Sequence, residues 1–253
     1  MVEFQRKDFY SYEDFLEIMR LLRAPGGCPW DREQTHSSIR RNFLEETYEV
    51  LDAIDHDDAS GMCEELGDVL MQVAFHAQIE AERGRFTMAN VVDGVARKLV
   101  YRHPHVFGDV QADTSQQVLA NWDVLKRREK GQRSTADAVE AVPHTLPALW
   151  RAEKIQSKTA KAGFDWTSSL QALDKLEEEV RELRAALEAG QAADAPHGIR
   201  EELGDALFIL CKIAQMSGVD PEDALHRACD KYQGRFRRVA DAADRPLNAY
   251  TEA

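Results

Sequence analysis

The chain has 253 residues, which is enough for one large domain or for two domains of ordinary size. Its formal net charge of −13 argues against general nucleic-acid binding, which requires a basic surface. No apolar run approaches the roughly 20 residues that cross a membrane. The four cysteines form no CxxC pair, and the segment MVEFQRKDFY lacks the apolar core of a signal peptide. We therefore expect a cytoplasmic protein without nucleic-acid or membrane partners.

The spacing of apolar residues predicts helices along the whole chain and gives no sign of a strand. The first expected helix starts at a capping box of Ser11 and Asp14. Further helices are expected at about 39–54, 62–81, 88–101 and 118–125, then at about 148–161, 168–188, 199–216 and 221–241. The last of these opens on Asp220 as N-cap, with Pro221 at its first position. The predicted fold class is all-α.

The sequence also indicates an internal duplication. Glu46 and Glu49 recur 133 residues later as Glu179 and Glu182, and other charged residues recur at the same or a similar offset. A period this long indicates two related domains, since the repeats of solenoids run to about 20–50 residues. Residues 131–147 hold two prolines and few large apolar side chains, which is typical of a linker. We therefore expect an N-terminal domain at 1–130 and a C-terminal domain at 148–253.

Each half carries four acidic residues in two pairs, and the members of a pair are three positions apart. Residues with this spacing share one face of a helix, so two such helices packed antiparallel would point four carboxylates at one another. Four negative charges at one place require a cation, and carboxylate oxygens suit Mg²⁺ or Mn²⁺ better than zinc. The expected metal ligands are Glu46, Glu49, Glu65 and Asp68 in the first half and Glu179, Glu182, Glu202 and Asp205 in the second.

Basic side chains suited to phosphate accompany these acidic pairs, and one tryptophan before the later pair is suited to stacking on a base. They are Lys98, Arg102, Lys154, Lys158, Lys175, Lys231, Arg235 and Trp166.

Two other interpretations of the function stay open. The acidic pairs would be solvated surface in a non-catalytic helical interaction module, and a related site would act on another pyrophosphate-bearing nucleotide, such as an alarmone.

Five long motifs carry a resemblance to a known family. The segments GGCPWDREQTHSSI, FLEETYEVLDAI, EELGDVLMQV, RKLVYRHPHVFGD and EKIQSKTAKAGFDW resemble those of MazG nucleoside triphosphate pyrophosphohydrolases, and the likeness covers about residues 8–240. The resemblance implies two tandem MazG-like helical bundles in a homodimer. It also implies Mg²⁺-dependent hydrolysis of NTPs and dNTPs to NMP and pyrophosphate, which would clear unwanted nucleotides. The sequence departs from the family at Gly198, where MazG chains often have a basic residue.

By motif match, the resemblance implies that Glu179, Glu182, Glu202 and Asp205 hold metal and that Lys175, Glu178, Lys231 and Arg235 contact the nucleotide. We expect the second half to carry most of the activity, because the counterpart of Lys175 in the first half is Asn42. Glu178, next to the ligand Glu179, is the candidate to orient or deprotonate a water that attacks the α-phosphorus.

Overall fold

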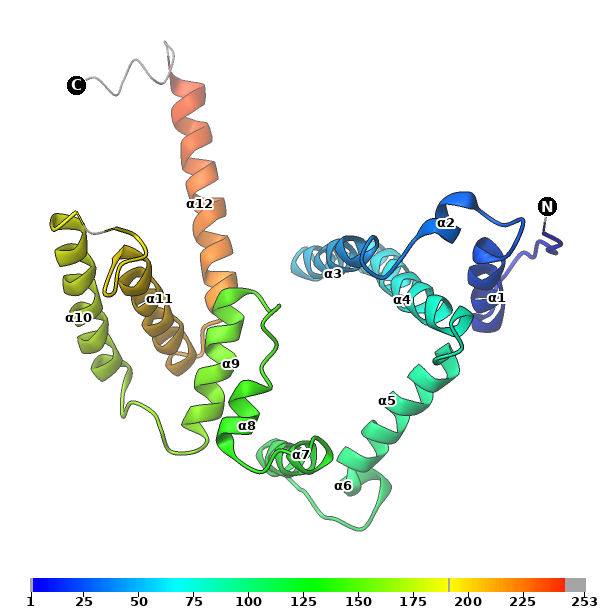
Figure 1. Cartoon of the computed structure of the whole chain (residues 1–253), viewed down its shortest axis with the longest axis horizontal. Helices are drawn as coiled ribbons and strands as arrows, with labels where there is room; N and C mark the ends of the chain where they lie inside the picture. Colours follow the sequence, from blue (N-terminus) through cyan, green and yellow to red (C-terminus); the bar gives the residue numbers. More distant parts are fainter. Residues whose placement is uncertain (1, 191, 244–253) are drawn as a thin grey trace. The chain divides into compact units, whose positions relative to one another are not determined.

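The computed structural model describes residues 2–190 and 192–243, and within them the chain forms helices and loops without a strand (Figure 1). The all-α prediction is confirmed. The chain divides into two compact units, Met1–Trp122 and Asp123–Ala253, and each is described by itself. None of the helices in the described ranges is long and apolar enough to cross a membrane.

Unit 1 is built around a helical hairpin. Its helices are α1 (Tyr12–Arg23), α2 (Pro29–Glu33), α3 (Arg40–Asp55), α4 (Ala59–Glu82), α5 (Met88–Arg102) and α6 (Pro104–Phe107), and α7 (Ser115–Glu129) starts in this unit. The predicted capping box of α1 is confirmed, since the Asp14 amide donates to the Ser11 hydroxyl. Helices α3 and α4 pack along each other, and α1 packs on the later part of α4. The buried core is formed by Met19, Ile39, Ala74, Phe75 and Ile79.

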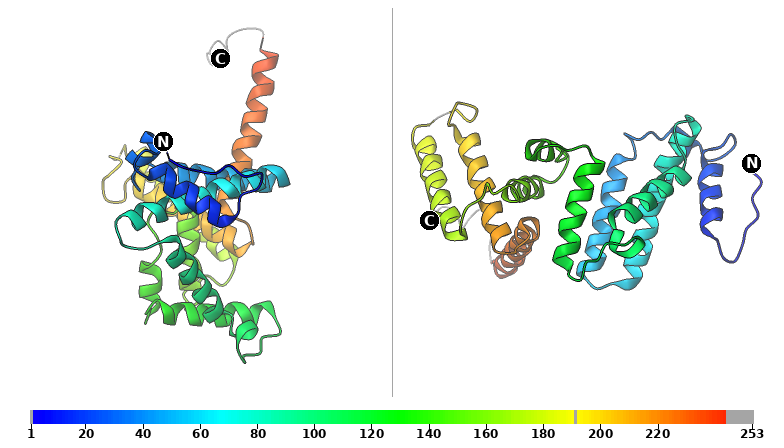
Figure 2. Two further views of the ribbon diagram at one scale, coloured as in Figure 1. Left: turned by 90° about the vertical axis from the view of Figure 1, so that its right-hand side faces the viewer. Right: turned by 90° about the horizontal axis from the view of Figure 1, so that it is seen from below.

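Unit 2 contains the equivalent hairpin. After the end of α7 come α8 (Thr135–Glu140), α9 (Ala148–Ala160), α10 (Ser169–Glu188), α11 (Ile199–Met216) and α12 (Pro221–Ala242). Helices α10 and α11 form the hairpin, and α9 packs on α11 (Figure 2). The Gln156 side chain of α9 donates to the Phe208 carbonyl of α11 at 2.7 Å. The predicted start of α12 is confirmed, because Asp220 caps it and Pro221 is its first residue.

The structure differs from the sequence-based expectation between the two hairpins. It divides the chain at Trp122, earlier than the expected domain end at 130, because α7 runs on into unit 2, where Asp123 pairs with Lys161. The expected linker 131–147 contains α8, which starts at a capping box of Ser134 and Asp137. The short helices α2 and α6, which each open on a proline, were not expected either. Helices this short carry no apolar periodicity.

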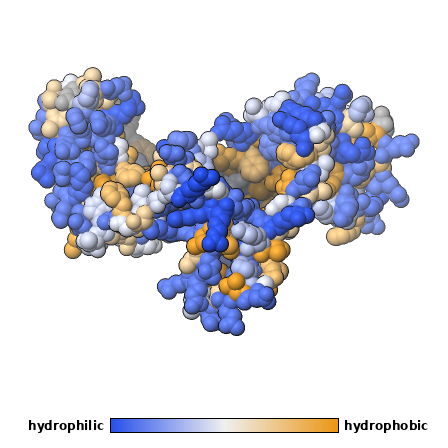
Figure 3. Space-filling model, turned by 60° about the horizontal axis from the view of Figure 1, so that its bottom comes forward, coloured by the Kyte–Doolittle hydropathy of each residue, from blue (hydrophilic) through white to orange (hydrophobic). Residues whose placement is uncertain are grey.

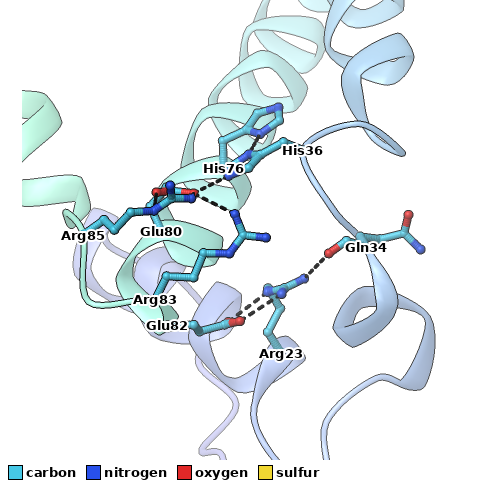
Figure 4. Close-up of polar contacts among 8 residues, drawn as sticks. All are labelled: Arg23, Gln34, His36, His76, Glu80, Glu82, Arg83 and Arg85. Carbon is cyan, nitrogen blue, oxygen red and sulfur yellow. Dashed lines mark hydrogen bonds and ion pairs between the residues drawn. The ribbon is translucent and has the colours of Figure 1, made fainter.

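A polar network ties the loop before α3 to the end of α4 (Figure 4). His36 stacks on His76 with ring centroids 4.9 Å apart, and its Nε2 lies 2.5 Å from Glu80 Oε1. Glu80 is buried and also pairs with Arg83 and Arg85. The hydrogen bond with His36, followed by that with Arg85, lowers the pKa of the Glu80 carboxyl. Burial and the neighbouring His36 lower the pKa of His76, which disfavours its protonation in the fold.

We expect unit 1 to lose stability on acidification because of this network. Because the pKa of His76 is lower in the fold than its ordinary value of 6.5, the unfolded chain binds the proton more readily, and stability is lost as the pH falls below about 6.5. The lowered Glu80 pKa adds stability above the ordinary carboxyl value of 4.5, which is lost as the pH falls through the folded pKa. The melting midpoint of the wild type should therefore fall more than that of His76→Gln between about pH 7.5 and about pH 5.5. Parallel falls in the two proteins would contradict the assignment to His76.

Candidate active site

The α10–α11 hairpin brings three of the predicted ligands together. Glu179 comes from α10, and Glu202 and Asp205 come from α11, one helical turn apart. One carboxylate oxygen from each lies within 4.8 Å of the others. Glu179 and Glu202 are buried, with 6% and 4% of their surfaces exposed, and Asp205 is exposed. Charged carboxylates are almost never buried unless they are paired, so two of them side by side indicate a site for a cation.

The electrostatics of the cluster point the same way. Burial raises the pKa of Glu202, and the charges of Glu182 and Glu179 raise it further. Burial also raises the pKa of Asp205, with Glu179 as the next cause. The negative charge of Glu179 therefore makes ionisation of Glu202 and Asp205 less favourable than it is in water. A divalent cation at this place would reverse that effect and lower the pKa values.

Lys175 lies one turn before Glu179 and pairs with two acidic groups. Its Nζ is 2.7 Å from Glu179 Oε1 and 2.8 Å from Glu178 Oε1. The hydrogen bond to Glu178, and next that to Glu179, raise the pKa of Lys175, while the same bond lowers the pKa of Glu178. Glu178 is thus a weak base while Lys175 holds it. A ligand that draws Lys175 away would make Glu178 more basic.

Unit 1 repeats the cluster with different neighbours. Oxygens of Glu46, Glu49 and Glu65 lie within 4.8 Å of one another. Burial raises the pKa of Glu46, followed by the charges of Asp68 and Glu49. Burial likewise raises the pKa of Glu65, followed by the charge of Glu49. Glu49 and Glu65 also line a cavity of about 290 Å³.

The two clusters differ in what faces the central glutamate. In unit 1 the Gln72 amide donates to Glu46 Oε1 at 3.4 Å, and position 42 is an asparagine. In unit 2 the equivalent Glu179 pairs with the Lys175 ammonium. Only unit 2 among the described residues therefore combines the carboxylate cluster with a cation suited to phosphate.

The fourth predicted ligand of each set lies close by. The charge of Glu182 contributes to the raised pKa of Glu202, and the charge of Asp68 contributes to the raised pKa values of Glu46 and Glu65.

The predicted basic residues fall into separate groups. Lys231 and Arg235 are exposed on α12. Lys98 is half-buried on α5, and Arg102 is buried with its guanidinium 5.0 Å from the centre of the Trp122 ring. In the described part of the chain, no ion pair joins Lys98, Lys231 or Arg235 to a carboxylate cluster.

Lys154 and Lys158 lie on α9, away from the carboxylates. Both line a cavity against α7, whereas Gln156 between them faces α11. Trp166 is half-buried in the loop that leads from α9 to α10. Among the predicted nucleotide-binding residues, Lys175 forms an ion pair with the acidic cluster of its own unit.

Two residues near the site were missed by sequence reasoning. Lys212 of α11 is almost fully buried, and its Nζ lies 2.5 Å from Asp165 Oδ1, which anchors the loop that carries Trp166. His197 Nδ1 lies 3.6 Å from Glu202 Oε1 at the start of α11. A lysine inside the apolar run ILCKIA was the signal for the first, since buried lysines require a partner. The second had no signal in the sequence.

Gly67 and Gly204 occupy equivalent mid-helix positions beside the clusters, where a glycine destabilises the helix relative to alanine. A Cβ atom at either position would meet nothing within 4 Å. Crowding within the unit therefore does not require these glycines. We expect Gly67→Ala and Gly204→Ala each to raise the free energy of unfolding by about 0.5–1 kcal/mol, because alanine favours the helix. Urea unfolding measures this, and a loss of stability would show that another group packs there.

Comparison with known proteins agrees with this geometry. The MazG nucleotide pyrophosphohydrolase domain matches twice, at residues 34–107 and 167–240, so the two matched segments are offset by 133 residues. Each match contains one carboxylate cluster.

Two relatives match over most of their length. The nucleoside triphosphate pyrophosphohydrolase of Escherichia coli K12 is 45% identical over 225 residues, which are 88% of this chain and 85% of that protein. The Thermotoga maritima protein named nucleoside triphosphate pyrophosphohydrolase/pyrophosphatase MazG is 41% identical over 234 residues, 92% of this chain and 87% of its own. The chain therefore belongs to the MazG family of nucleotide pyrophosphohydrolases, and it contains the family's domain twice.

Proposed function

We propose that this protein hydrolyses nucleoside triphosphates to the monophosphate and pyrophosphate at the carboxylate cluster of unit 2. The observation that carries the proposal is the convergence of Glu179, Glu202 and Asp205 beside Lys175. The names of the E. coli and T. maritima relatives, which cover most of this chain, support the substrate class. Removal of unwanted or non-standard nucleotides is the role that we infer.

Mg²⁺ fits the donor set of this cluster. All the converging ligands are carboxylate oxygens, which Mg²⁺ and Mn²⁺ prefer, and no imidazole or thiolate is among them. Glu179, Glu202 and Asp205 would hold the ion, with Glu182 in reach as a fourth ligand. Bound there, the ion would offset the charge of the triphosphate and polarise its phosphoryl oxygens.

The chain's own residues have distinct tasks in this proposal. The Lys175 ammonium exchanges its contacts with Glu178 and Glu179 for a phosphate oxygen. Glu178, released from that contact, orients a water for attack on the α-phosphorus and accepts its proton. The carboxylates are acceptors only when ionised, so they do not protonate the leaving group. Pyrophosphate would leave without a general acid, because the bound cation and the Lys175 ammonium would offset its negative charge.

A homodimer is part of the proposal. Lys231 and Arg235 are exposed on α12, where they are suited to phosphates bound by a second subunit. Apolar patches interrupt the hydrophilic surface in Figure 3. The second helix of each hairpin exposes leucines at equivalent positions, Leu66 and Leu70 in α4 and Leu203 and Leu207 in α11. Light scattering coupled to size exclusion measures the oligomeric state.

The test of the proposed reaction is product analysis in ¹⁸O-labelled water with Mg²⁺. We expect monophosphate and pyrophosphate as products, with the label in the monophosphate, because attack is at the α-phosphorus. Label in pyrophosphate, or release of orthophosphate and the diphosphate, would contradict the mechanism. No turnover of any NTP, dNTP or alarmone would favour a non-catalytic helical module.

The four free cysteines support a reducing compartment, and we infer that the protein is located in the cytoplasm.

A further inference from the structure

Unit 2 contains a second charged site, a cavity of about 170 Å³ between α7 and α9. One wall is the end of α7 and the turn after it, and the other is α9 with its C-cap. Ala141, Val142 and Pro143 complete the lining near the start of α9. The charged lining residues are Lys126, Arg127, Lys130, Lys154, Lys158 and Lys161, with Asp123 as the single acid among them.

The spacing of these residues shows that the cavity is a shared face of two helices. Lys154, Lys158 and Lys161 follow each other at intervals of four and three residues, which is one stripe of a helix. Gln156, which bonds to α11, points about 160° away from that stripe at ~100° per residue. The stripe therefore faces away from α11, which carries Glu202 and Asp205, and the cavity is separate from the carboxylate cluster of its unit.

The positive charge in the cavity is poorly compensated by the cavity's own lining. Asp123, the single acid of the lining, pairs with Lys161. Among the described residues, neither Lys154 nor Lys158 forms an ion pair. Burial lowers the pKa of Lys158; the charge of Asp123 opposes this shift, and the cations of Arg127, Lys161 and Lys154 add to it. The protein has a net charge of −13, so this concentration of positive charge is local and runs against its overall composition.

Size and charge together select the ligand. Pockets that enclose drug-sized ligands measure about 300–1,000 Å³, so about 170 Å³ suits a compact inorganic anion better than a whole nucleotide. No aromatic side chain lines the cavity to stack on a base. One phosphate group carries about −1.5 to −2 at pH 7, which offsets less than half of the formal charge of the cavity, whereas two linked groups offset most of it. Lysines bind phosphate as point charges, whereas the planar guanidinium of an arginine such as Arg127 is able to donate to two phosphate oxygens at once.

We propose that the α7–α9 cavity is a diphosphate-binding site, distinct from the carboxylate cluster, in which Arg127, Lys154 and Lys158 hold the anion. The diphosphate comes either as free inorganic pyrophosphate or as the tail of a nucleoside polyphosphate. Bound there, it links α7 to α9 and so stabilises the packing at the start of unit 2. Binding at this cavity does not depend on the proposed reaction and is measured without turnover.

Isothermal titration calorimetry of the full-length protein with inorganic pyrophosphate in EDTA tests the site. Chelation removes divalent cations, so the carboxylate cluster repels the anion. We expect the wild type to bind, and Arg127→Ala and the double variant Lys154→Ala/Lys158→Ala each to bind at least about tenfold more weakly, since hydrogen bonds to charged groups are lost. Lys158→Arg should retain binding. Circular dichroism and thermal melting establish that each variant is folded.

Two matched variants distinguish binding in this cavity from binding elsewhere on the protein. Arg128→Ala removes the same charge one position along α7, from an exposed side chain outside the cavity, and should bind like the wild type. Glu179→Gln should also retain binding. Equal weakening in Arg128→Ala would reduce the effect to diffuse surface charge, and weakening in Glu179→Gln would assign the anion to the carboxylate cluster. Either result, or no binding by the wild type, overturns the proposal.

The source of the diphosphate is distinguished by two further titrations in EDTA. If a nucleoside triphosphate binds, and Arg127→Ala weakens its binding as it weakens that of pyrophosphate, the polyphosphate tail of a nucleotide is a source of the diphosphate. If the nucleoside triphosphate does not bind, free pyrophosphate is the ligand. A nucleoside monophosphate that binds as tightly as pyrophosphate would show that one phosphate is sufficient, which contradicts a diphosphate site.

Discussion

Replacing Glu179 with glutamine is expected to lower kcat/KM for nucleoside triphosphates by about 100-fold or more, whereas Glu46→Gln leaves most of the activity. Glu179 is buried, belongs to the converging carboxylates and pairs with Lys175. Glutamine keeps the size of the side chain but removes its charge. A metal ion that stabilises charge in the transition state contributes several kcal/mol, and each 1.36 kcal/mol is a factor of ten in rate.

The equivalent change in unit 1 removes a group in a different setting. Glu46 accepts from Gln72, and Asn42 takes the position equivalent to Lys175, so the Glu46 cluster has no counterpart of the Lys175 ammonium in the part of the chain that the structure describes. Steady-state kinetics on both variants measure the difference. Glu177→Gln is the matched control, because it removes the same charge from an exposed position on α10, two residues before Glu179. Equal losses in Glu46→Gln and Glu179→Gln would show that both units are active sites.

The long helices were predictable because their sequences combine apolar periodicity with local end signals. Ser11 with Asp14 and Asp220 with Pro221 mark helix starts at which side chains cap the backbone, and the structure has both. The short helices α2, α6 and α8 span four to six residues, too few to establish a period. The capping box at Ser134 was readable, but the prolines and small residues around it are also typical of a linker.

The acidic clusters were predictable for a related reason. Pairs three residues apart must share a helix face, and the position of that face beside an apolar arc follows from the helical period. The orientation of α9 did not follow, because the residue that turns toward α11 is the polar Gln156. Hydropathy alone does not show which face of such a helix is buried. Lys154 and Lys158 were therefore read as part of the nucleotide site, although they face a separate cavity.

Removal of divalent cations is expected to abolish turnover and to lower the melting midpoint of the wild type. A ligand that binds only the folded state stabilises it by about 2.7 kcal/mol at 100 times its Kd. Mg²⁺ should therefore raise the midpoint and restore the activity of EDTA-treated protein, and Mn²⁺ should substitute for it. An unchanged midpoint together with full activity in EDTA would contradict a metal-dependent reaction.

The variant Glu202→Gln separates the effect of the carboxylate cluster on folding stability from its effect on activity. The pKa of Glu202 is raised above its ordinary value of 4.5, so the folded metal-free protein binds more protons there than the unfolded chain does. Ionised Glu202 then lowers stability, and this loss appears as the pH rises from about 4.5 through the folded pKa. In EDTA the variant should melt above the wild type at about pH 7.5, with a smaller gap at about pH 5. It should also lose activity and respond less to Mg²⁺, because the carboxylate that destabilises the empty cluster is the one that holds the ion. A variant that melts below the wild type in EDTA would show that Glu202 stabilises the hairpin instead.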